Sequence, residues 1–275
     1  MGTPEKNQEN LMRLDEIPLL GLLAKKVDKM VGQLGLYEAA RELVRESATK
    51  LEVKNQTSET QDILRNKPAV VVYNHPYDAE PAALIASLPP RADISLVTTE
   101  TLLGLGNNLA KYFLPIYYTE QSKIKKEAER FFKIPEILRV RFSPVLNEFE
   151  KAKKNWQTLK LAAQRVINGS LVGIAPEGSW GKEKKWFTGI GHLLKEISSD
   201  TDAYFVRVYI KGTSDLDILR LFHLTGTVLP KIEVVFDTPK KIADLLQGNP
   251  SAKEITSREE ASYKSWVTSI ERRTL

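Results

Sequence analysis

One imidazole and two carboxylates lie within the segment Asn74-His75-Pro76-Tyr77-Asp78-Ala79-Glu80. An imidazole takes up or releases a proton near neutral pH, and a carboxylate on one ring nitrogen fixes which nitrogen carries it. Glu80 is placed to fold back against the His75 ring, and Asp78 is expected to cap a helix that begins near Glu80. No nucleophile adjoins the pair, so it suits the activation of a substrate hydroxyl. Capping and ordinary turn chemistry explain the same residues equally well.

A second candidate element is the sequence Ala175-Pro176-Glu177-Gly178-Ser179-Trp180. Gly178 permits the close approach of backbone to a ligand. Glu177 can accept hydrogen bonds from substrate hydroxyls, and Lys182 follows in a basic stretch. Taken alone, these residues are explained more simply by a tight turn.

Both elements follow short apolar runs of the kind that form strands buried on both faces. Strands are predicted at residues 69–73, 94–98, 171–175, 204–210 and 232–236, and helices at 80–87, 156–167 and 191–197. Strands that alternate with helices indicate an α/β fold with a central mixed, largely parallel sheet flanked by helices. Because such sheets bind ligands at the carboxyl ends of their strands, His75 and Glu177 are expected to face a shared cleft.

The N-terminal segment, residues 1–58, is predicted to be helical. Apolar residues recur at three- and four-residue steps over 19–44, Gly32 and Gly35 mark a turn, and a second helix is expected over 37–50. This helical pair either packs on the rest of the protein or lies in a membrane surface with its apolar face in the lipid. Residues 59–275 are predicted to form one α/β domain.

Residues 119–160 form a basic insertion in that domain. Lysine and arginine together outnumber glutamate there by five, which equals the net charge of the whole chain. Aromatic and aliphatic residues are interleaved with these charges. The insertion is either a solvated helical excursion or a basic flap that touches anionic lipid or an acidic carrier protein.

The composition excludes several classes of protein. The chain contains no cysteine, which rules out disulfides, thiolate metal sites and a cysteine nucleophile. Its net charge of +5 permits anionic partners, but no nucleic-acid-binding module is recognisable and no nucleic-acid partner is expected. The first ten residues do not resemble a secretory signal. Because no apolar stretch reaches the ~20 residues that a spanning helix needs, the protein is expected to be soluble or to lie on a membrane surface. If it lies on a membrane, we expect the cytoplasmic side.

Together, the two elements resemble motifs of the glycerolipid acyltransferase superfamily, which includes 1-acylglycerol-3-phosphate and glycerol-3-phosphate acyltransferases. The first motif of that family is Asn-His, four residues and then Asp (HX4D). Here Asn74-His75 is followed by Pro-Tyr-Asp-Ala and Glu80. The third family motif, Phe-Pro-Glu-Gly-Thr-Arg, is similar to residues 175–180. The likeness covers about residues 60–212.

The resemblance implies an acyltransferase of phospholipid biosynthesis that is peripheral to the inner face of the cell membrane. His75 would deprotonate a hydroxyl of a lipid or lipid precursor, which would attack the thioester of acyl-CoA or acyl carrier protein. Glu80 would stabilise the imidazolium, with Asp78 as the fallback partner. Neither a metal nor a cofactor besides the acyl donor is implied. The residues implied in substrate binding are Asn74, Asp78, Glu177, Gly178, Ser179 and Lys182.

This sequence departs from the family pattern at several positions. Glu80 is one methylene longer than the family's aspartate, and tyrosine within residues 112–118 and Trp180 stand where arginines are expected. Because arginine binds phosphate through paired hydrogen bonds, the replacements leave open whether the acceptor bears a phosphate. Two other functions stay open: a non-catalytic lipid-surface binder with the same fold, and an acyl hydrolase. The hydrolase is disfavoured because a Gly-x-Ser-x-Gly pattern is absent.

Overall fold

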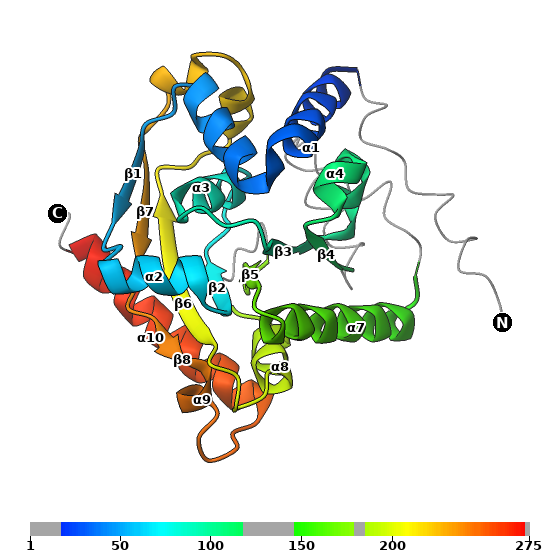
Figure 1. Ribbon diagram of the computed structural model, residues 1–275, viewed down its shortest axis with the longest axis vertical. Coiled ribbons are helices and arrows are strands. Elements are labelled where there is room, and N and C mark those ends of the chain that lie inside the picture. The colour runs from blue at the N-terminus through cyan, green and yellow to red at the C-terminus, as the bar shows by residue number, and fades with distance from the viewer. Residues whose placement is uncertain (1–17, 118–145, 179–184, 273–275) are drawn as a thin grey trace. The chain divides into compact units, whose positions relative to one another are not determined.

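The computed structural model describes residues 18–117, 146–178 and 185–272 (Figure 1). The chain forms two compact units. Unit 1 comprises residues 1–33 and 98–158, and unit 2 comprises residues 34–97 and 159–275. These divisions follow contacts in space, so the domain boundary expected at residue 58 stays a prediction.

Unit 2 is built on a mixed, largely parallel sheet in the order β1-β7-β6-β2-β5-β3, with β8 beside β6. β2 pairs in parallel with both β5 and β6, β3 with β5, and β1 with β7, whereas β7 and β8 run antiparallel to β6. The predicted fold class is therefore confirmed. The strands are β1 (Leu51–Lys54), β2 (Ala69–Tyr73), β3 (Ile94–Thr99, whose last two residues belong to unit 1), β5 (Leu171–Ile174), β6 (Tyr204–Lys211), β7 (Ile232–Phe236) and β8 (Lys240–Lys241).

The central strand β2 is buried along its whole length, and Val70, Val71 and Val72 are fully inaccessible. Such burial accounts for the continuous β-branched run, because a strand covered on both faces has no polar side to present. Val72 pairs with Ile174 of β5 and with Arg207 of β6. The register brings the carboxyl ends of β2 and β5 to the same edge of the sheet.

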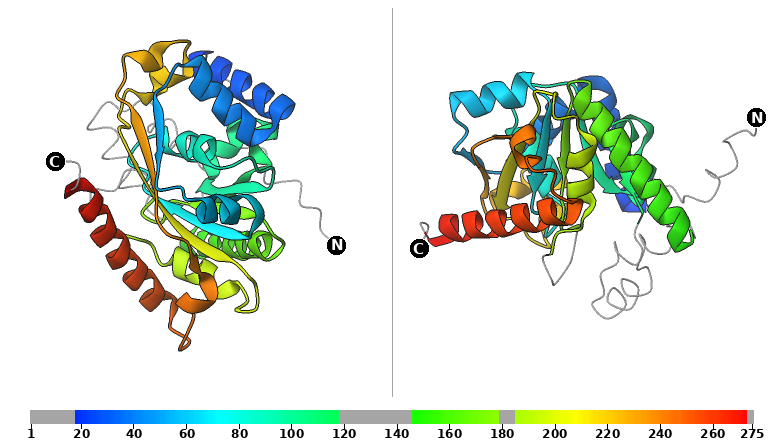
Figure 2. Two further views of the ribbon diagram at one scale, coloured as in Figure 1. Left: turned by 60° about the vertical axis from the view of Figure 1, so that its left-hand side comes forward. Right: turned by 90° about the horizontal axis from the view of Figure 1, so that it is seen from below.

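Helices cover both faces of this sheet (Figure 2). On one face, Leu84 of α3 lies next to Gly173 of β5, whereas on the other Arg207 of β6 donates a hydrogen bond to Ser262 of α10. α10 packs against α8, and the peptide N–H of Gly191 donates to the Thr256 hydroxyl. The helices of unit 2 are α2 (Ser58–Asn66), α3 (Glu80–Ser87), α8 (Gly189–Glu196), η4 (Asp217–Leu221), η5 (Thr225–Thr227), α9 (Ile242–Leu245) and α10 (Ala252–Arg272).

Two helices pass from one unit into the other, α1 (Pro18–Glu46) and α7 (Glu148–Ile167). α1 consists of two helical parts, because Gly35 has a non-helical backbone with φ 79°. The turn predicted within residues 19–50 is thus confirmed at Gly35, whereas Gly32 lies inside the first part. The second part ends at Glu46 and not at Lys50 as predicted, since Lys50 leads directly into β1.

Unit 1 also contains η3 (Glu100–Leu105), α4 (Asn107–Ala110) and β4 (Phe113–Ile116). Asp28 of α1 accepts hydrogen bonds from the peptide N–H groups of Asn108 and Leu109, at 2.8 and 2.9 Å, and so satisfies the first turn of α4. Most of the basic insertion predicted at 119–160 lies outside the described residues. Its remainder forms the first part of α7.

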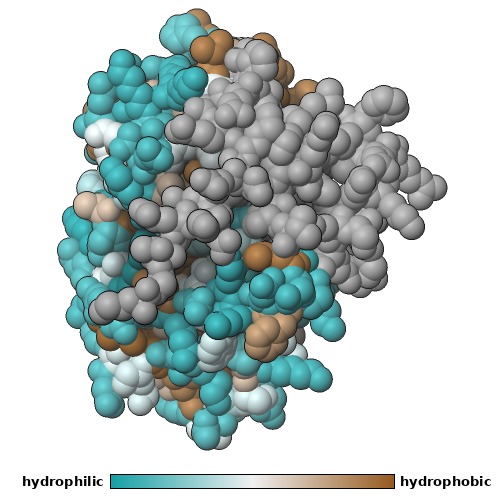
Figure 3. Space-filling model, turned by 90° about the vertical axis from the view of Figure 1, so that its right-hand side faces the viewer, coloured by the Kyte–Doolittle hydropathy of each residue, from teal (hydrophilic) through white to brown (hydrophobic). Residues whose placement is uncertain are grey.

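No helix within the described residues is long and apolar enough to cross a membrane. On the face drawn in Figure 3, the described surface is mostly hydrophilic, with apolar residues set between polar ones.

Candidate functional site

The chain leaves β2 through Asn74, whose side-chain amide is held by the neighbouring strand β6. Asn74 Nδ2 donates to the carbonyl oxygen of Ile210 at 2.7 Å, and the N–H of Ile210 donates to Asn74 Oδ1 at 2.8 Å. The hydroxyl of Tyr263 donates to the same Oδ1 at 3.4 Å and to the Val208 carbonyl at 2.9 Å. Asn74 therefore continues the pairing of β2 beyond its last residue and fixes where the next bend begins.

His75 lies in that bend, and the predicted contact with Glu80 is confirmed. His75 Nδ1 is 3.0 Å from Glu80 Oε2, and the peptide N–H of Tyr77 donates to the same oxygen at 3.3 Å. A carboxylate on Nδ1 holds the proton of a neutral imidazole there and leaves the Nε2 lone pair available. Nε2 has no hydrogen-bond partner among the described residues, and the His75 side chain is 18% exposed.

Glu80 occupies the first turn of α3, with Pro81 beside it in the sequence. Its side chain is completely buried, and within the described chain its second oxygen, Oε1, has no hydrogen-bond partner. Burying a charged carboxylate costs free energy unless other charges or hydrogen bonds compensate it. The contacts of Oε2 with His75 and with the N–H of Tyr77 supply part of this compensation.

The prediction that Asp78 caps α3 is wrong. The cap position is Ala79, and no side chain makes the capping hydrogen bond. The Glu80 carboxylate accepts the peptide N–H of Tyr77, so the turn before α3 is closed from inside the helix. Asp78 therefore lies in the bend near His75, where it is exposed.

Glu177 and Gly178 form the turn that follows β5, at the same edge of the sheet as His75. The N–H of Gly178 donates to the Ala175 carbonyl at 3.0 Å, and Gly178 has a φ of 68°, in the left-handed region that glycine adopts without strain. The N–H of Phe187 donates to the Pro176 carbonyl at 2.8 Å. The two predicted elements therefore end adjacent parallel strands, as a shared site requires.

Tyr263 contacts the end of β2 and lies close enough to Glu177 for the two groups to interact electrostatically. Burial raises the pKa of its hydroxyl well above the usual value of 10.0, and the nearby negative charge of Glu177 raises it further. The same hydroxyl contacts Asn74. The ring of Tyr263 also contacts two tryptophans at steep angles, with ring centroids 5.4 Å from Trp186 and 5.7 Å from Trp266. Reasoning from sequence missed this residue, because nothing near residue 263 resembles a motif.

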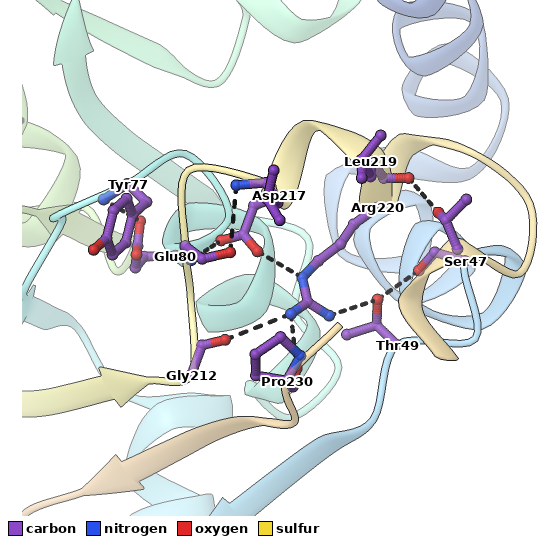
Figure 4. Close-up of polar contacts among 12 residues, drawn as sticks. Ser47, Thr49, Tyr77, Glu80, Gly212, Asp217, Leu219, Arg220 and Pro230 are labelled. Atoms are coloured by element: carbon purple, nitrogen blue, oxygen red, sulfur yellow. Dashed lines mark hydrogen bonds and ion pairs between the residues drawn. The ribbon is translucent and has the colours of Figure 1, made fainter. Parts of the chain in front are cut away.

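Sequence reasoning also missed Asp217 and Arg220, which form a buried ion pair behind Glu80 (Figure 4). The available signal was an acid and a base three residues apart among aliphatic residues, at Leu216-Asp217-Ile218-Leu219-Arg220-Leu221. Such a pair on one helical turn is usually a surface ion pair. In this chain the usual burial pattern is reversed. Leu216, Ile218 and Leu219 are exposed, whereas the two charged side chains are buried.

Two predicted site residues, Ser179 and Lys182, lie outside the described residues. The tyrosine-rich stretch at 112–117 belongs to unit 1, where burial raises the pKa of Tyr117 above its usual value and Lys154 lies 4.9 Å from the centre of its ring.

Comparison with known proteins gives a distant likeness to solved structures. No family model matches the chain, and no curated protein matches it. Among solved structures, it is similar to the 1-acyl-sn-glycerophosphate (LPA) acyltransferase PlsC from Thermotoga maritima. The identity is 15% and the TM-score 0.46, over 90% of this chain and 79% of the other. A likeness at this level carries no residue roles, so function rests on the site described above.

Proposed function

We propose that this protein is an O-acyltransferase that moves a fatty acyl group from a thioester to a hydroxyl of a lipid or lipid precursor. The observation that carries the proposal is the 3.0 Å contact between His75 Nδ1 and Glu80 Oε2, at the strand edge that also bears the Glu177–Gly178 turn. This pair supplies a base and a group that orients it. The motif likeness of residues 74–80 and 175–180 supplies the reaction class.

The reaction needs no nucleophile from the protein. His75 Nε2 takes the proton of the acceptor hydroxyl as its oxygen attacks the thioester carbonyl. The tetrahedral intermediate then expels the thiolate, which receives that proton from the imidazolium. An ester and a free thiol result, and His75 is returned to its neutral form. Throughout, the Glu80 carboxylate stabilises the imidazolium across the Nδ1 contact.

Direct transfer is favoured over a covalent acyl-enzyme by the surroundings of His75. The chain has no cysteine, and among the described residues no serine or threonine hydroxyl is hydrogen-bonded to the ring. A hydroxyl activated by Nε2 therefore comes from a bound molecule.

We assign substrate contacts to the turn residues around the pair. Glu177 and the backbone at Gly178 would bind acceptor hydroxyls, with Asp78, Ser179 and Lys182 nearby in the sequence. Asn74 uses both ends of its amide on Ile210, so its part is to hold the bend in place. The donor would be acyl-CoA or acyl carrier protein, with no further cofactor or metal. A lipid acceptor would make this a reaction of phospholipid biosynthesis, carried out at the anionic inner face of the cell membrane.

The test is an incubation of the purified protein with labelled acyl-CoA or acyl carrier protein and a total lipid extract, followed by mass spectrometry of the products. The expected result is a new acyl ester that disappears in His75→Ala, while the thermal unfolding curve of the variant stays close to that of wild type. His223→Ala is the matched control and should retain transfer, because His223 is exposed.

Two other outcomes would overturn the proposal. Release of free fatty acid without an acceptor would identify a hydrolase. Flotation with liposomes, without transfer to any acceptor, would identify a lipid-surface binder.

A further inference from the structure

The buried pair Asp217–Arg220 is held from several directions (Figure 4). Arg220 Nε donates to Asp217 Oδ1 at 2.9 Å, and its terminal nitrogens donate to the Pro230 carbonyl at 2.7 Å and to Thr49 Oγ1 at 3.3 Å. The N–H of Ser214 donates to Asp217 Oδ2 at 2.8 Å. The side chains of Asp217 and Arg220 are only 2% and 7% exposed. Removing two ions from water costs free energy, and apolar residues of similar size are often as stabilising at such a position or more so.

Asp217 lies close enough to Glu80 for their charges to interact. Burial raises the pKa of Asp217 above its usual value, the hydrogen bonds from Arg220 and Ser214 lower it, and the charge of Glu80 raises it again. In Figure 4 the Glu80 and Asp217 side chains lie next to each other. Oε1 is the Glu80 oxygen that His75 does not use, and in the described chain it lacks a hydrogen-bond partner. Four groups thus stand in series: an imidazole, two carboxylates and a guanidinium.

Other charged and titratable groups lie around Glu80, both on the strands packed against α3 and at the strand edge. α3 packs against β1, β6 and β7, and the charged residues near these contacts bind one another: Glu52, Lys54, Lys211, Lys231 and Glu233. At the strand edge itself stand Asp78, Glu177 and the phenols of Tyr73, Tyr77 and Tyr263. The ring of Tyr73 lies 6.2 Å from that of His75.

We infer that Asp217 and Arg220 are positioning residues that set, through Glu80, how tightly His75 holds a proton. With the pair intact, the carboxylate of Asp217 faces Glu80, and the charge of Arg220 offsets most of its repulsion. Loss of the Asp217 charge alone would leave a buried cation behind Glu80. That cation would compete with the imidazolium for the Glu80 carboxylate, so His75 would release its proton more easily. The consequence for catalysis rests on the proposed function, whereas the electrostatic relation does not.

The experiment follows the three imidazoles of the chain, His75, His192 and His223, by NMR titration of protein labelled at histidine. In Asp217→Asn the midpoint for His75 should fall by roughly half to one pH unit, less than the shift from a charge in direct contact. The other two histidines should not move. The double variant Asp217→Asn with Arg220→Gln removes both charges and should return the midpoint most of the way to wild type.

The matched control is Asp93→Asn. Asp93 also pairs with a buried arginine, Arg91, but at the amino-terminal edge of the sheet, where the N–H of Leu171 donates to the Asp93 carbonyl. This variant should leave the His75 midpoint unchanged. A His75 midpoint that does not move in Asp217→Asn, or that moves equally in Asp93→Asn, would overturn the inference.

A second measurement decides the matter if Asp217→Asn does not fold. Coupling between two groups is reciprocal, so in Glu80→Gln the carboxyl of Asp217 should titrate at lower pH than in wild type, as followed by carbon NMR. An unchanged Asp217 titration would count against the inference.

Activity separates this inference from the proposed function. If wild type transfers acyl groups, the acid limb of its kcat/KM profile should move with the His75 midpoint in Asp217→Asn. If transfer occurs but neither moves, the inference fails and the proposed function stands. If wild type transfers nothing, the proposed function fails, and the NMR titrations still test the inference.

Discussion

The side chain of Asn74 and the backbone of Ile210 exchange two hydrogen bonds, one in each direction, at 2.7 and 2.8 Å. In this way a side chain makes the contacts that another residue of β2 would make. The bend that carries His75 therefore starts from a fixed point on the sheet.

Replacing Asn74 by alanine is expected to loosen this bend. Both hydrogen bonds are lost and the two backbone groups of Ile210 become unsatisfied, so the free energy of unfolding should fall by about 1–3 kcal/mol. Transfer activity should fall as well, because His75 is then less well placed. Denaturant unfolding and an acyl-transfer assay measure the two effects. Asn155→Ala, which removes a similar pair of bonds to Tyr117 in unit 1, calibrates the stability loss. A fully active Asn74→Ala variant would contradict this account of the bend.

Glu80→Gln should separate activity from stability. The amide keeps the shape of the buried side chain and can turn its nitrogen toward Asp217, so the unfolding temperature should change little. It cannot balance a positive imidazolium, so kcat should fall by at least about 100-fold. Initial rates and a thermal melt of the same preparation give the comparison. A loss of fold that matches the loss of rate would show that Glu80 acts only through packing.

Gly191 lies where α8 meets α10. A Cβ there would overlap the Ala252 carbonyl oxygen and lie 2.7 Å from Thr256 Oγ1. Because these contacts are too short for backbone to accommodate, Gly191→Ala should lower the free energy of unfolding by about 2 kcal/mol or more. Gly189→Ala in the same helix places its Cβ 3.7 Å from Leu159 and is the control, with little expected loss. Equal stabilities for the two variants in chemical denaturation would be inconsistent with the packing described.

Glu233 links stability to pH. Hydrogen bonds from Lys54, Lys231 and Lys211 lower the pKa of its carboxyl to about 2. A folded-state pKa below the unfolded value of 4.5 gives stability that is fully present above about pH 4.5 and is lost as the pH falls toward 2. The shift corresponds to at most about 3 kcal/mol. Since Lys54 and Lys231 are 39% and 45% exposed, we expect about 1–2 kcal/mol after solvent screening.

In Glu233→Gln, the free energy of unfolding at pH 7 should accordingly drop by that amount, and its decline between pH 4.5 and pH 2 should become shallower. Urea unfolding at a series of pH values measures both. Glu260→Gln breaks an exposed pair with Lys264 and should cost less than about 0.5 kcal/mol. An unchanged acid slope in Glu233→Gln would rule out this source of pH dependence.

The strands that are buried on both faces of the sheet could be predicted from the sequence. The runs at 69–73 and 232–236 match β2 and β7 to the residue, because strands covered on both faces leave a continuous apolar signal. β1 and α10 gave no such signal. β1 has four residues, of which Glu52 and Lys54 are charged, and its pairing with β7 depends on residues far away in the sequence.

In the candidate site, contacts between residues close in the sequence could be predicted, whereas contacts between distant residues could not. The contact between His75 and Glu80 is local and could be predicted from spacing. Contacts that bridge long separations could not, as with Asn74 to Ile210, Tyr263 to Asn74, and Asp217 beside Glu80. Asp78 does not cap α3 as predicted, because the Glu80 carboxylate accepts the N–H of Tyr77 and closes the turn in its place.

Tyr263 comes from α10, which follows all of the described strands in the chain. During synthesis on the ribosome, β2, β5 and the turns that bear Asn74, His75 and Glu177 emerge before Tyr263, whose hydroxyl binds Asn74. A nascent chain that has not yet made α10 has its whole sheet available for pairing but an incomplete strand edge. Folding of this edge is therefore expected to wait until α10 has been made, so that His75 reaches its final arrangement later than the strands on either side of it.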